Sequence, residues 1–198
     1  MLRWPEVLRR PVAAGALLLA LYAGLSFTKD PRGYLGTDTG GKVATLRAME
    51  QRGDLHPDVG YWAEQWDPKG ELHPLAASRV ERRWVTVATL PMLYASYPLY
   101  RVAGLRALIV FPALGALAAA FAARRLAQLI GRADGGGDGD GWAAFWLIGL
   151  ASPLVIYALD FWEHAPGVGL IGWGVALLVG DRPGWRRVTI IAAITALG

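Results

Sequence analysis

The sequence has no cysteine among its 198 residues, and only 18 % of its residues are charged. Without cysteine the protein has no disulfide bonds, iron–sulfur clusters, thiolate zinc sites or cysteine nucleophile. Soluble domains usually contain about 25 % charged residues. Because 54 % of this chain is hydrophobic, a soluble cytosolic enzyme is disfavoured, and so is a disordered chain, which requires low hydrophobicity.

The chain also lacks a strong excess of one charge. It has 20 Lys and Arg residues against 16 Asp and Glu residues, a net charge of +4. These charges are dispersed, so they do not form the basic surface that nucleic-acid binding requires, and we expect no nucleic-acid partner. The composition therefore predicts a membrane protein whose main surroundings are the lipid bilayer.

A membrane-spanning helix needs about 20 mostly apolar residues, and five apolar stretches of the sequence are candidates. No small-x-small cleavage site follows the first apolar stretch, which favours an uncleaved helix over a signal peptide. The last stretch has room for only about 17 Å of helix, so we expect the chain to end within a helix and to be the N-terminal part of a longer polytopic protein. The five stretches are residues 12–27, 105–123, 142–159, 166–180 and 188–198.

Residues 84–100 are ambiguous because they are long enough to span but contain two prolines and three tyrosines. Short loops rich in Lys and Arg stay on the cytoplasmic side. The arginine clusters within 3–10, 124–132 and 182–187 all fall inside only if residues 84–100 do not cross. We therefore expect a juxtamembrane helix there, with its aromatic side chains at the headgroup level.

The predicted fold is an all-α polytopic protein of the plasma membrane with about five transmembrane helices in a single membrane domain, residues 1–198. Its N-terminus is expected to be cytoplasmic. Residues 28–104 are expected to form a long external loop with amphipathic juxtamembrane helices. Residues 131–141, rich in Gly and Asp, are expected to be a flexible cytoplasmic linker, since their aspartates lack the Glu that completes a calcium loop.

The external segments hold most of the acidic residues and all three histidines. Nine of the 16 Asp and Glu residues lie within 28–83, where nine basic residues balance them. This is a mixed polar surface rather than a polyanion-binding patch. Loops of this length between two helices are usually functional.

Residues 36–42, with the sequence GTDTGGK, match the front of a phosphate-binding loop. The next residue is a valine where the magnesium-binding Ser or Thr should stand, so we expect no ATP site. After it, apolar residues recur every third position and a glycine follows, which predicts a short amphipathic helix over 42–53. The residues of this pattern are Val43, Leu46, Met49 and Gly53.

Asp38 stands at the mouth of this predicted helix, where two roles are open. Asp38 or Thr39 is an N-cap that satisfies free backbone N–H groups. Alternatively, Asp38 is a carboxylate at the membrane surface that accepts a proton from a hydroxyl group or binds a metal ion.

Two other external clusters carry candidate polar chemistry. In one, Asp160, Glu163 and His164 lie in a short turn, where spacings of three and four residues would place them on one helical face. They are either solvated interfacial anchors or functional ionisable groups. In the other, Lys69 and Arg79, with His73 between them, supply cations for a lipid-linked phosphate or for phospholipid headgroups.

The order of these elements resembles the N-terminal module of the polytopic membrane glycosyltransferases of the GT-C superfamily. The resemblance covers roughly residues 12–180. It consists of a first helix, a long external loop with Thr37-Asp38-Thr39 before an amphipathic helix, a helix ending in Ala123-Arg124-Arg125-Leu126, and a helix ending at Ser152-Pro153 before the acidic turn. Many members have paired acids in the first loop, whereas threonines flank Asp38 here.

The resemblance implies a glycosyltransferase that moves a sugar from a polyprenyl-phosphate donor to a saccharide or another hydroxyl acceptor on the extracytoplasmic face. Asp38 would be the catalytic base or a metal ligand, and Lys69 or Arg79 would bind the phosphate. The acidic turn and His73 would bind substrate, and Trp62 and Trp66 would stack on sugar rings or anchor the loop at the interface. A divalent metal, if used, would have Asp38, Glu163 and His164 as its ligands.

Two alternatives remain at this stage. A transporter module should have charged residues and broken helices within its spans, whereas here the charges cluster in loops and Ser152-Pro153 is the main irregularity. A non-catalytic membrane scaffold would use the external loop to bind proteins.

Overall fold

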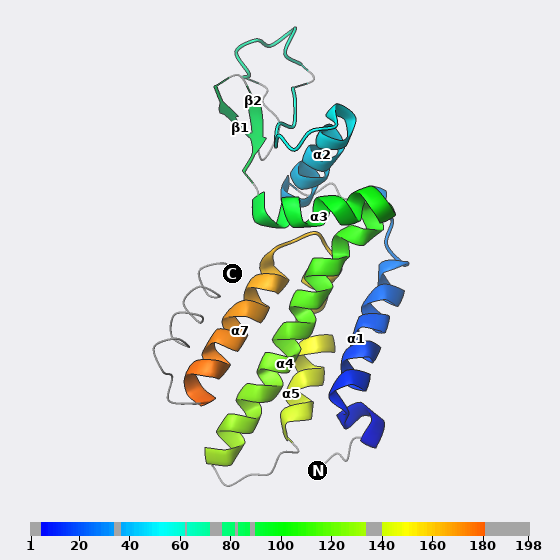
Figure 1. Ribbon diagram of the computed structural model, residues 1–198, viewed down its shortest axis with the longest axis vertical. Coiled ribbons are helices and arrows are strands. Elements are labelled where there is room, and N and C mark those ends of the chain that lie inside the picture. Colours follow the sequence, from blue (N-terminus) through cyan, green and yellow to red (C-terminus); the bar gives the residue numbers. More distant parts are fainter. Residues whose placement is uncertain are drawn as a thin grey trace. The chain divides into compact units, whose positions relative to one another are not determined.

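The computed structural model describes residues 5–33, 37–61, 63–71, 77–81, 83–87, 90–133 and 140–180. These residues are mostly helical (Figure 1). The chain divides into two compact units: a helical unit made of Met1–Thr28 and Ile109–Gly198, and a loop unit made of Lys29–Leu108. The expected span at 188–198, His73, Trp62 and most of the expected linker at 131–141 lie outside the described residues.

The helical unit is built around one long helix, α4 (Val110–Ala133). A short 3-10 turn, η1 (Glu6–Arg9), leads into α1 (Pro11–Ser26). Then follow α5 (Asp140–Leu150), α6 (Leu154–Ala158) and α7 (His164–Gly180). Helix α4 contacts α1, α5, α6 and α7, so it forms the centre of this unit (Figure 1).

The core of the helical unit is aromatic at its centre. The Phe145 ring of α5 lies 4.8 Å from Phe121 of α4 and 4.9 Å from Trp146, measured between ring centroids. Helix α1 joins this core through Leu18 and Tyr22, which are fully buried. The Tyr22 hydroxyl donates a 2.6 Å hydrogen bond to the Gly149 carbonyl, so α1 is fixed to α5 by a polar contact as well as by packing.

Helices α4 and α7 approach each other closely because glycines and alanines face each other. A Cβ atom added at Gly115 of α4 would overlap the backbone of Ala165 and Pro166, and one added at Gly169 of α7 would overlap the Gly115 carbonyl. Further along, Gly172 lies against Ala122. Small residues at such spacings let two helix backbones meet, as they commonly do in membrane proteins.

The expected single helix over 142–159 is wrong, because the chain forms α5 and α6 with a break at residues 151–153. Pro153 has no N–H group to continue the helical hydrogen bonds. The Ser152 hydroxyl donates to the Ile148 carbonyl at 2.7 Å and accepts from the Leu154 N–H at 3.2 Å. The Ser152 side chain therefore provides hydrogen-bond partners for two backbone groups at the break.

Within the described residues, one helical stretch, Leu90–Gly131, is long and apolar enough to cross a membrane on the grounds of length and composition. Three apolar helices are shorter: Pro11–Ser26, Gly141–Leu150 and His164–Gly180. The long stretch is not one uniform helix, since Gly104 adopts a left-handed φ of 68° after α3 and a 3-10 segment follows. The mostly helical fold is confirmed, while the polytopic arrangement stays a prediction.

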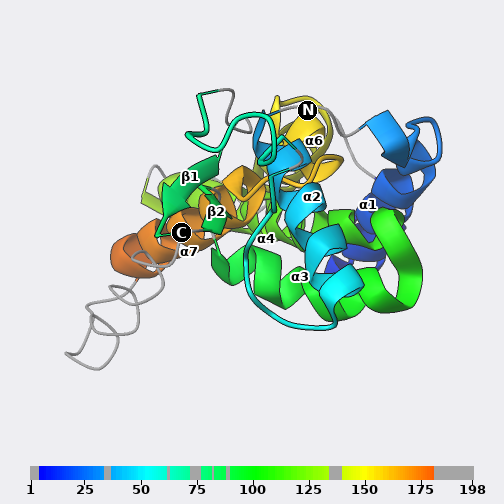
Figure 2. The ribbon, with the colours of Figure 1, turned by 90° about the horizontal axis from the view of Figure 1, so that it is seen from above.

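The loop unit covers nearly the same residues as the loop expected at 28–104. It contains the 3-10 turn η2 (Pro31–Gly33), helix α2 (Thr37–Arg52), strands β1 (Ala77–Val80) and β2 (Arg83–Thr86), and helix α3 (Leu90–Ala103). The 3-10 segment η3 (Gly104–Ile109) follows α3. Helix α2 packs against α3 and β2 (Figures 1 and 2).

The hairpin of β1 and β2 corrects the expectation of a helix beginning at residue 84. The strands are antiparallel, with Ala77 opposite Thr86 and Arg79 opposite Trp84. On β2 the burial alternates, since Trp84 and Thr86 are buried and Arg83 is exposed. This period of two is that of a strand with one covered face, and the helical part of residues 84–100 is confined to α3.

Candidate functional site

Asp38 lies in the first turn of α2, which begins at Thr37 and thus five residues earlier than expected. It is therefore inside the helix rather than a cap ahead of it. A carboxylate in the first turn is stabilised by the positive end of the helix dipole. Asp38 remains half-exposed, so its carboxylate is accessible to a substrate hydroxyl.

One turn further along α2, Lys42 is fully buried, with 0 % of its surface exposed. The amphipathic pattern predicted for residues 42–53 does not indicate this burial. Thr39 at 2 % and Thr45 at 0 % are buried on the same helix, while Val43, Leu46 and Met49 are buried as predicted. Lys42 follows Asp38 by four residues, so the two residues lie one helical turn apart on α2.

Such a buried ammonium group is unusual, because an ionised side chain inside a protein requires polar or charged compensation. Lys42 and Thr39 both take part in polar or electrostatic interactions. The sequence gives little signal for this burial, since a lysine between apolar positions of a short helix normally reaches solvent.

The two predicted phosphate-binding cations, Lys69 and Arg79, are brought together by the hairpin. The Arg79 Nη1 atom donates to the Pro68 carbonyl at 3.2 Å and the Lys69 carbonyl at 3.5 Å. Both side chains are exposed. The turn that carries Lys69 closes with a 3.0 Å hydrogen bond from the Gly70 N–H to the Asp67 carbonyl, so the Arg79 side chain of β1 binds the backbone of this turn.

The Trp84 ring packs against Gly70 of the same turn. Gly70 has a φ of 72°, and a Cβ atom there would overlap the Trp84 ring. The Tyr61 ring lies 5.1 Å from Trp84, and its hydroxyl donates a 2.6 Å hydrogen bond to Asp67 Oδ2. Trp66, a predicted sugar-stacking residue, is 71 % exposed beside this cluster.

The Tyr61–Asp67 hydrogen bond gives a pH-dependent prediction. Desolvation, followed by the hydrogen bond and the negative charge of Asp67, raises the pKa of Tyr61 to about 12. Because the folded-state pKa is above the ordinary value of 10.0, we expect stability to fall as pH rises from about 10 to about 12. A Tyr61→Phe variant should lose part of this dependence, measured by thermal unfolding at each pH.

Tyr94→Phe is the matched control, because Tyr94 is 37 % exposed on α3 of the same unit. It should keep the loss of stability between these pH values. An unchanged pH dependence in Tyr61→Phe would show that the hydrogen bond to Asp67 does not hold this turn.

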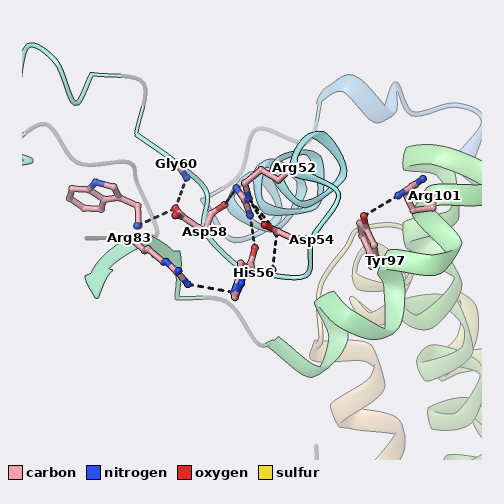
Figure 3. A network of polar contacts seen from close by, with 9 residues as sticks. Arg52, Asp54, His56, Asp58, Gly60, Arg83, Tyr97 and Arg101 are labelled. Atoms are coloured by element: carbon pink, nitrogen blue, oxygen red, sulfur yellow. Dashed lines mark hydrogen bonds and ion pairs between the residues drawn. The ribbon is translucent and has the colours of Figure 1, made fainter. Parts of the chain in front are cut away.

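A polar network that the sequence did not reveal closes the loop after α2 (Figure 3). Arg52, the last residue of α2, contacts the Asp54 carboxylate at 3.3 Å and donates to the carbonyls of His56 at 2.6 Å and Asp58 at 2.8 Å. Asp58 in turn accepts from the N–H groups of Gly60 and Trp84. This network ties α2 to β2.

Two charge effects accompany this network. Partial desolvation opposes ionisation of Asp54, but hydrogen bonds from the His56 N–H and Arg52, with the charge of Arg52, lower its pKa overall. Arg83 Nη1 lies 3.4 Å from His56 Nδ1 (Figure 3). The signal in the sequence was the run Asp54-Leu55-His56-Pro57-Asp58, which is typical of a turn built on aspartate side chains.

The acidic turn of the helical unit differs from its expected form. Asp160 lies after α6 and His164 opens α7, so Asp160, Glu163 and His164 do not share one helical face. Instead, Asp160 Oδ1 accepts a 2.7 Å hydrogen bond from the Phe161 N–H. The expected short turn between two helices is therefore confirmed, whereas the shared helical face is wrong.

Aromatic rings gather around this turn. The His164 imidazole stacks on Tyr157 with a centroid distance of 4.9 Å and an angle of 13° between planes. Trp162 lies 5.2 Å from each of these two rings. The Trp162 Nε1–H group is buried with no hydrogen-bond partner among the described residues, which is costly unless a ligand or water accepts it.

The described residues contain no group of three or more His, Asp and Glu side chains that could hold a metal ion. Asp38 belongs to the loop unit, whereas Glu163 and His164 belong to the helical unit. The donor set named from the sequence is therefore not assembled within either unit. Comparison of the chain with family models, curated proteins and solved structures finds no match.

Proposed function

We propose that this protein is a polytopic membrane glycosyltransferase of the GT-C type that uses a polyprenyl-phosphate sugar as donor. One observation carries the proposal. The compact loop unit, which follows the first apolar helix and precedes α4, carries a half-exposed carboxylate, Asp38, one helical turn from the buried Lys42. The exposed cations Lys69 and Arg79 of the same unit, joined by a hydrogen bond from the Arg79 side chain to the Lys69 carbonyl, suit a phosphate leaving group.

The proposed reaction is a displacement at the anomeric carbon of the donor sugar. The acceptor hydroxyl oxygen forms a bond to that carbon, and the bond between the carbon and the phosphate oxygen breaks. Asp38 takes the hydroxyl proton, and the bonding electrons leave with the phosphate. Because negative charge builds up on the departing phosphate, Lys69 and Arg79 would stabilise the transition state.

The acidic turn of the helical unit is a second, separate candidate for binding substrate. Sugar rings have hydroxyl groups along their edges and apolar faces, which suit carboxylates and aromatic rings. Asp160 and Glu163 are half-buried beside Tyr157, Trp162 and His164. The unsatisfied Trp162 N–H supports a polar ligand here.

The membrane arrangement can be tested by labelling single cysteines from each side, since the chain has none. Exposed positions suit this test: Leu55 at 59 %, Ile130 at 60 %, and His164. We expect outside, inside and outside, respectively. Outside labelling of Ile130 would mean that α3 spans and that Asp38 and the acidic turn lie on opposite sides of the membrane, which would end the proposed site.

The activity itself requires a direct assay. Membranes containing the protein should transfer labelled sugar from a polyprenyl-phosphate donor to a hydroxyl acceptor, and membranes without it should not. Correct topology without transfer over a panel of donors and acceptors would favour the scaffold function instead.

A transporter module is the second candidate, because the break between α5 and α6 is the kind of interruption that transporters have within their spans. Against it, Ser152 satisfies backbone groups at the break. The helices on both sides contain no Asp, Glu, Lys, Arg or His between Gly141 and Leu159. Uptake of solute into vesicles containing the protein, unchanged by substitution of Asp38, would favour this candidate.

A further inference from the structure

A second polar site lies in the helical unit, at the end where the chain begins. A pocket of about 350 Å³ is lined by Glu6, Arg9, Arg10, Arg124 and Trp142. This volume is within the range of small-molecule sites, which is about 300–1,000 Å³. The pocket lies at the opposite end of the unit from the turn between α6 and α7 (Figure 1).

The lining carries three guanidinium groups against one carboxylate. Arg9 and Arg10 come from the residues just before α1, while Arg124 comes from α4. Arg124 is held in place by its position over the Trp142 ring, with 4.2 Å from Cζ to the ring centroid. One arginine is therefore anchored by the fold and the other two close the pocket from the N-terminal side.

The one acidic group does not cancel this charge. Glu6 pairs with Arg10 at 3.4 Å, but the two side chains are 85 % and 72 % exposed. An exposed ion pair of this kind is weak, so an anionic ligand that binds Arg10 more strongly can replace Glu6 as its partner. The pocket retains a net charge of about +2 from these four groups.

Helix α1 adds to the positive potential. Its N-cap residue, Arg10, makes no side-chain capping hydrogen bond. The first N–H groups of a helix point toward such an end and favour an anion there.

We propose that this pocket binds a phosphate group presented by an anionic phospholipid headgroup. Guanidinium groups match phosphate oxygens in a fork geometry. Basic pockets between membrane helices on the cytoplasmic side suit anionic headgroups, and a tryptophan in the wall suits the interfacial depth. The inference goes beyond the transfer reaction and does not rest on it.

Native mass spectrometry of the full chain in neutral detergent tests the proposal directly. Phosphatidic acid and phosphatidylglycerol should be retained more strongly than phosphatidylcholine, whose zwitterionic headgroup carries a choline cation that the arginines repel. The double variant Arg9→Gln/Arg10→Gln should lose at least about tenfold in affinity for the anionic lipids. These two residues are exposed, so this variant should keep the fold even if Arg124→Gln does not.

Two further variants sharpen the result. Glu6→Gln removes the only carboxylate in the described lining, so it should raise the affinity. Arg32→Gln, at an exposed arginine of the loop unit, should leave it unchanged. Equal lipid retention in wild type and in the double variant, or an equal loss in Arg32→Gln, would overturn the proposal.

Adding inorganic phosphate distinguishes a lipid headgroup from free phosphate as the occupant of the pocket. If millimolar phosphate leaves the retained phosphatidylglycerol in place, the headgroup is supported as the occupant. If phosphate displaces the lipid and protects wild type but not the double variant against thermal unfolding, the pocket is a free-phosphate site and the headgroup assignment is overturned.

Discussion

Asp38→Asn is expected to lower the rate of sugar transfer by about 100-fold to 10,000-fold, the range that a general base contributes. Asparagine has nearly the shape of aspartate but does not accept a proton from the acceptor hydroxyl. Asp38 is half-exposed in the first turn of α2, so the loss of its charge should cost the helix no more than about 1 kcal/mol. The measurement is the initial rate in membranes that contain equal amounts of each protein.

Asp30→Asn is the matched control, since Asp30 is an exposed aspartate of the same unit that accepts a hydrogen bond from the Arg32 N–H. It should retain the wild-type rate. An Asp38→Asn protein with unchanged transfer would remove the catalytic role of this residue, whereas loss of transfer in both variants would indicate damage to the loop unit.

Gly115→Ala is expected to destabilise the helical unit by about 3 kcal/mol, the upper end of the usual cost of overpacking a core. The added methyl group would meet the backbone of Ala165 and Pro166 at the start of α7. Backbone atoms do not move aside as a flexible side chain does, so α7 must shift away from α4. Thermal unfolding in detergent, followed by circular dichroism, measures the effect.

Gly131→Ala provides a control on the same helix, where an added Cβ meets nothing within 4 Å. Alanine is the better helix former by about 1 kcal/mol, so this variant should be as stable as wild type or more so. Equal melting temperatures for Gly115→Ala and wild type would contradict the close packing of α4 on α7.

Much of the helical structure follows from local patterns in the sequence. The uncharged run after Pro11 gives α1, and the three-residue spacing of Val43, Leu46 and Met49 gives the buried face of α2. Gly53 ends that helix with a φ of 71°. These features depend on residues close together in the chain, which is why they are predictable.

The rest depends on contacts between distant residues. Residues 84–86 pair with β1 because Trp84 packs beside Tyr61 and Gly70, although their apolar character also suits an interfacial helix. Lys42 is buried by the residues that pack around α2 in the folded unit. Its position relative to the apolar residues of the helix does not reveal this packing. The catalytic assignment of Asp38 came from the order of elements in the chain and stays a prediction.

The path of the chain through its two units has a consequence for biosynthesis. Helix α1 packs against α4 and bonds to α5, which are made much later, since Tyr22 and its acceptor Gly149 are 127 positions apart. At a synthesis rate of about 5–20 residues per second, roughly 6–25 s pass between them. During this interval the whole loop unit is made, so it can fold before the helices that flank it in the chain have met.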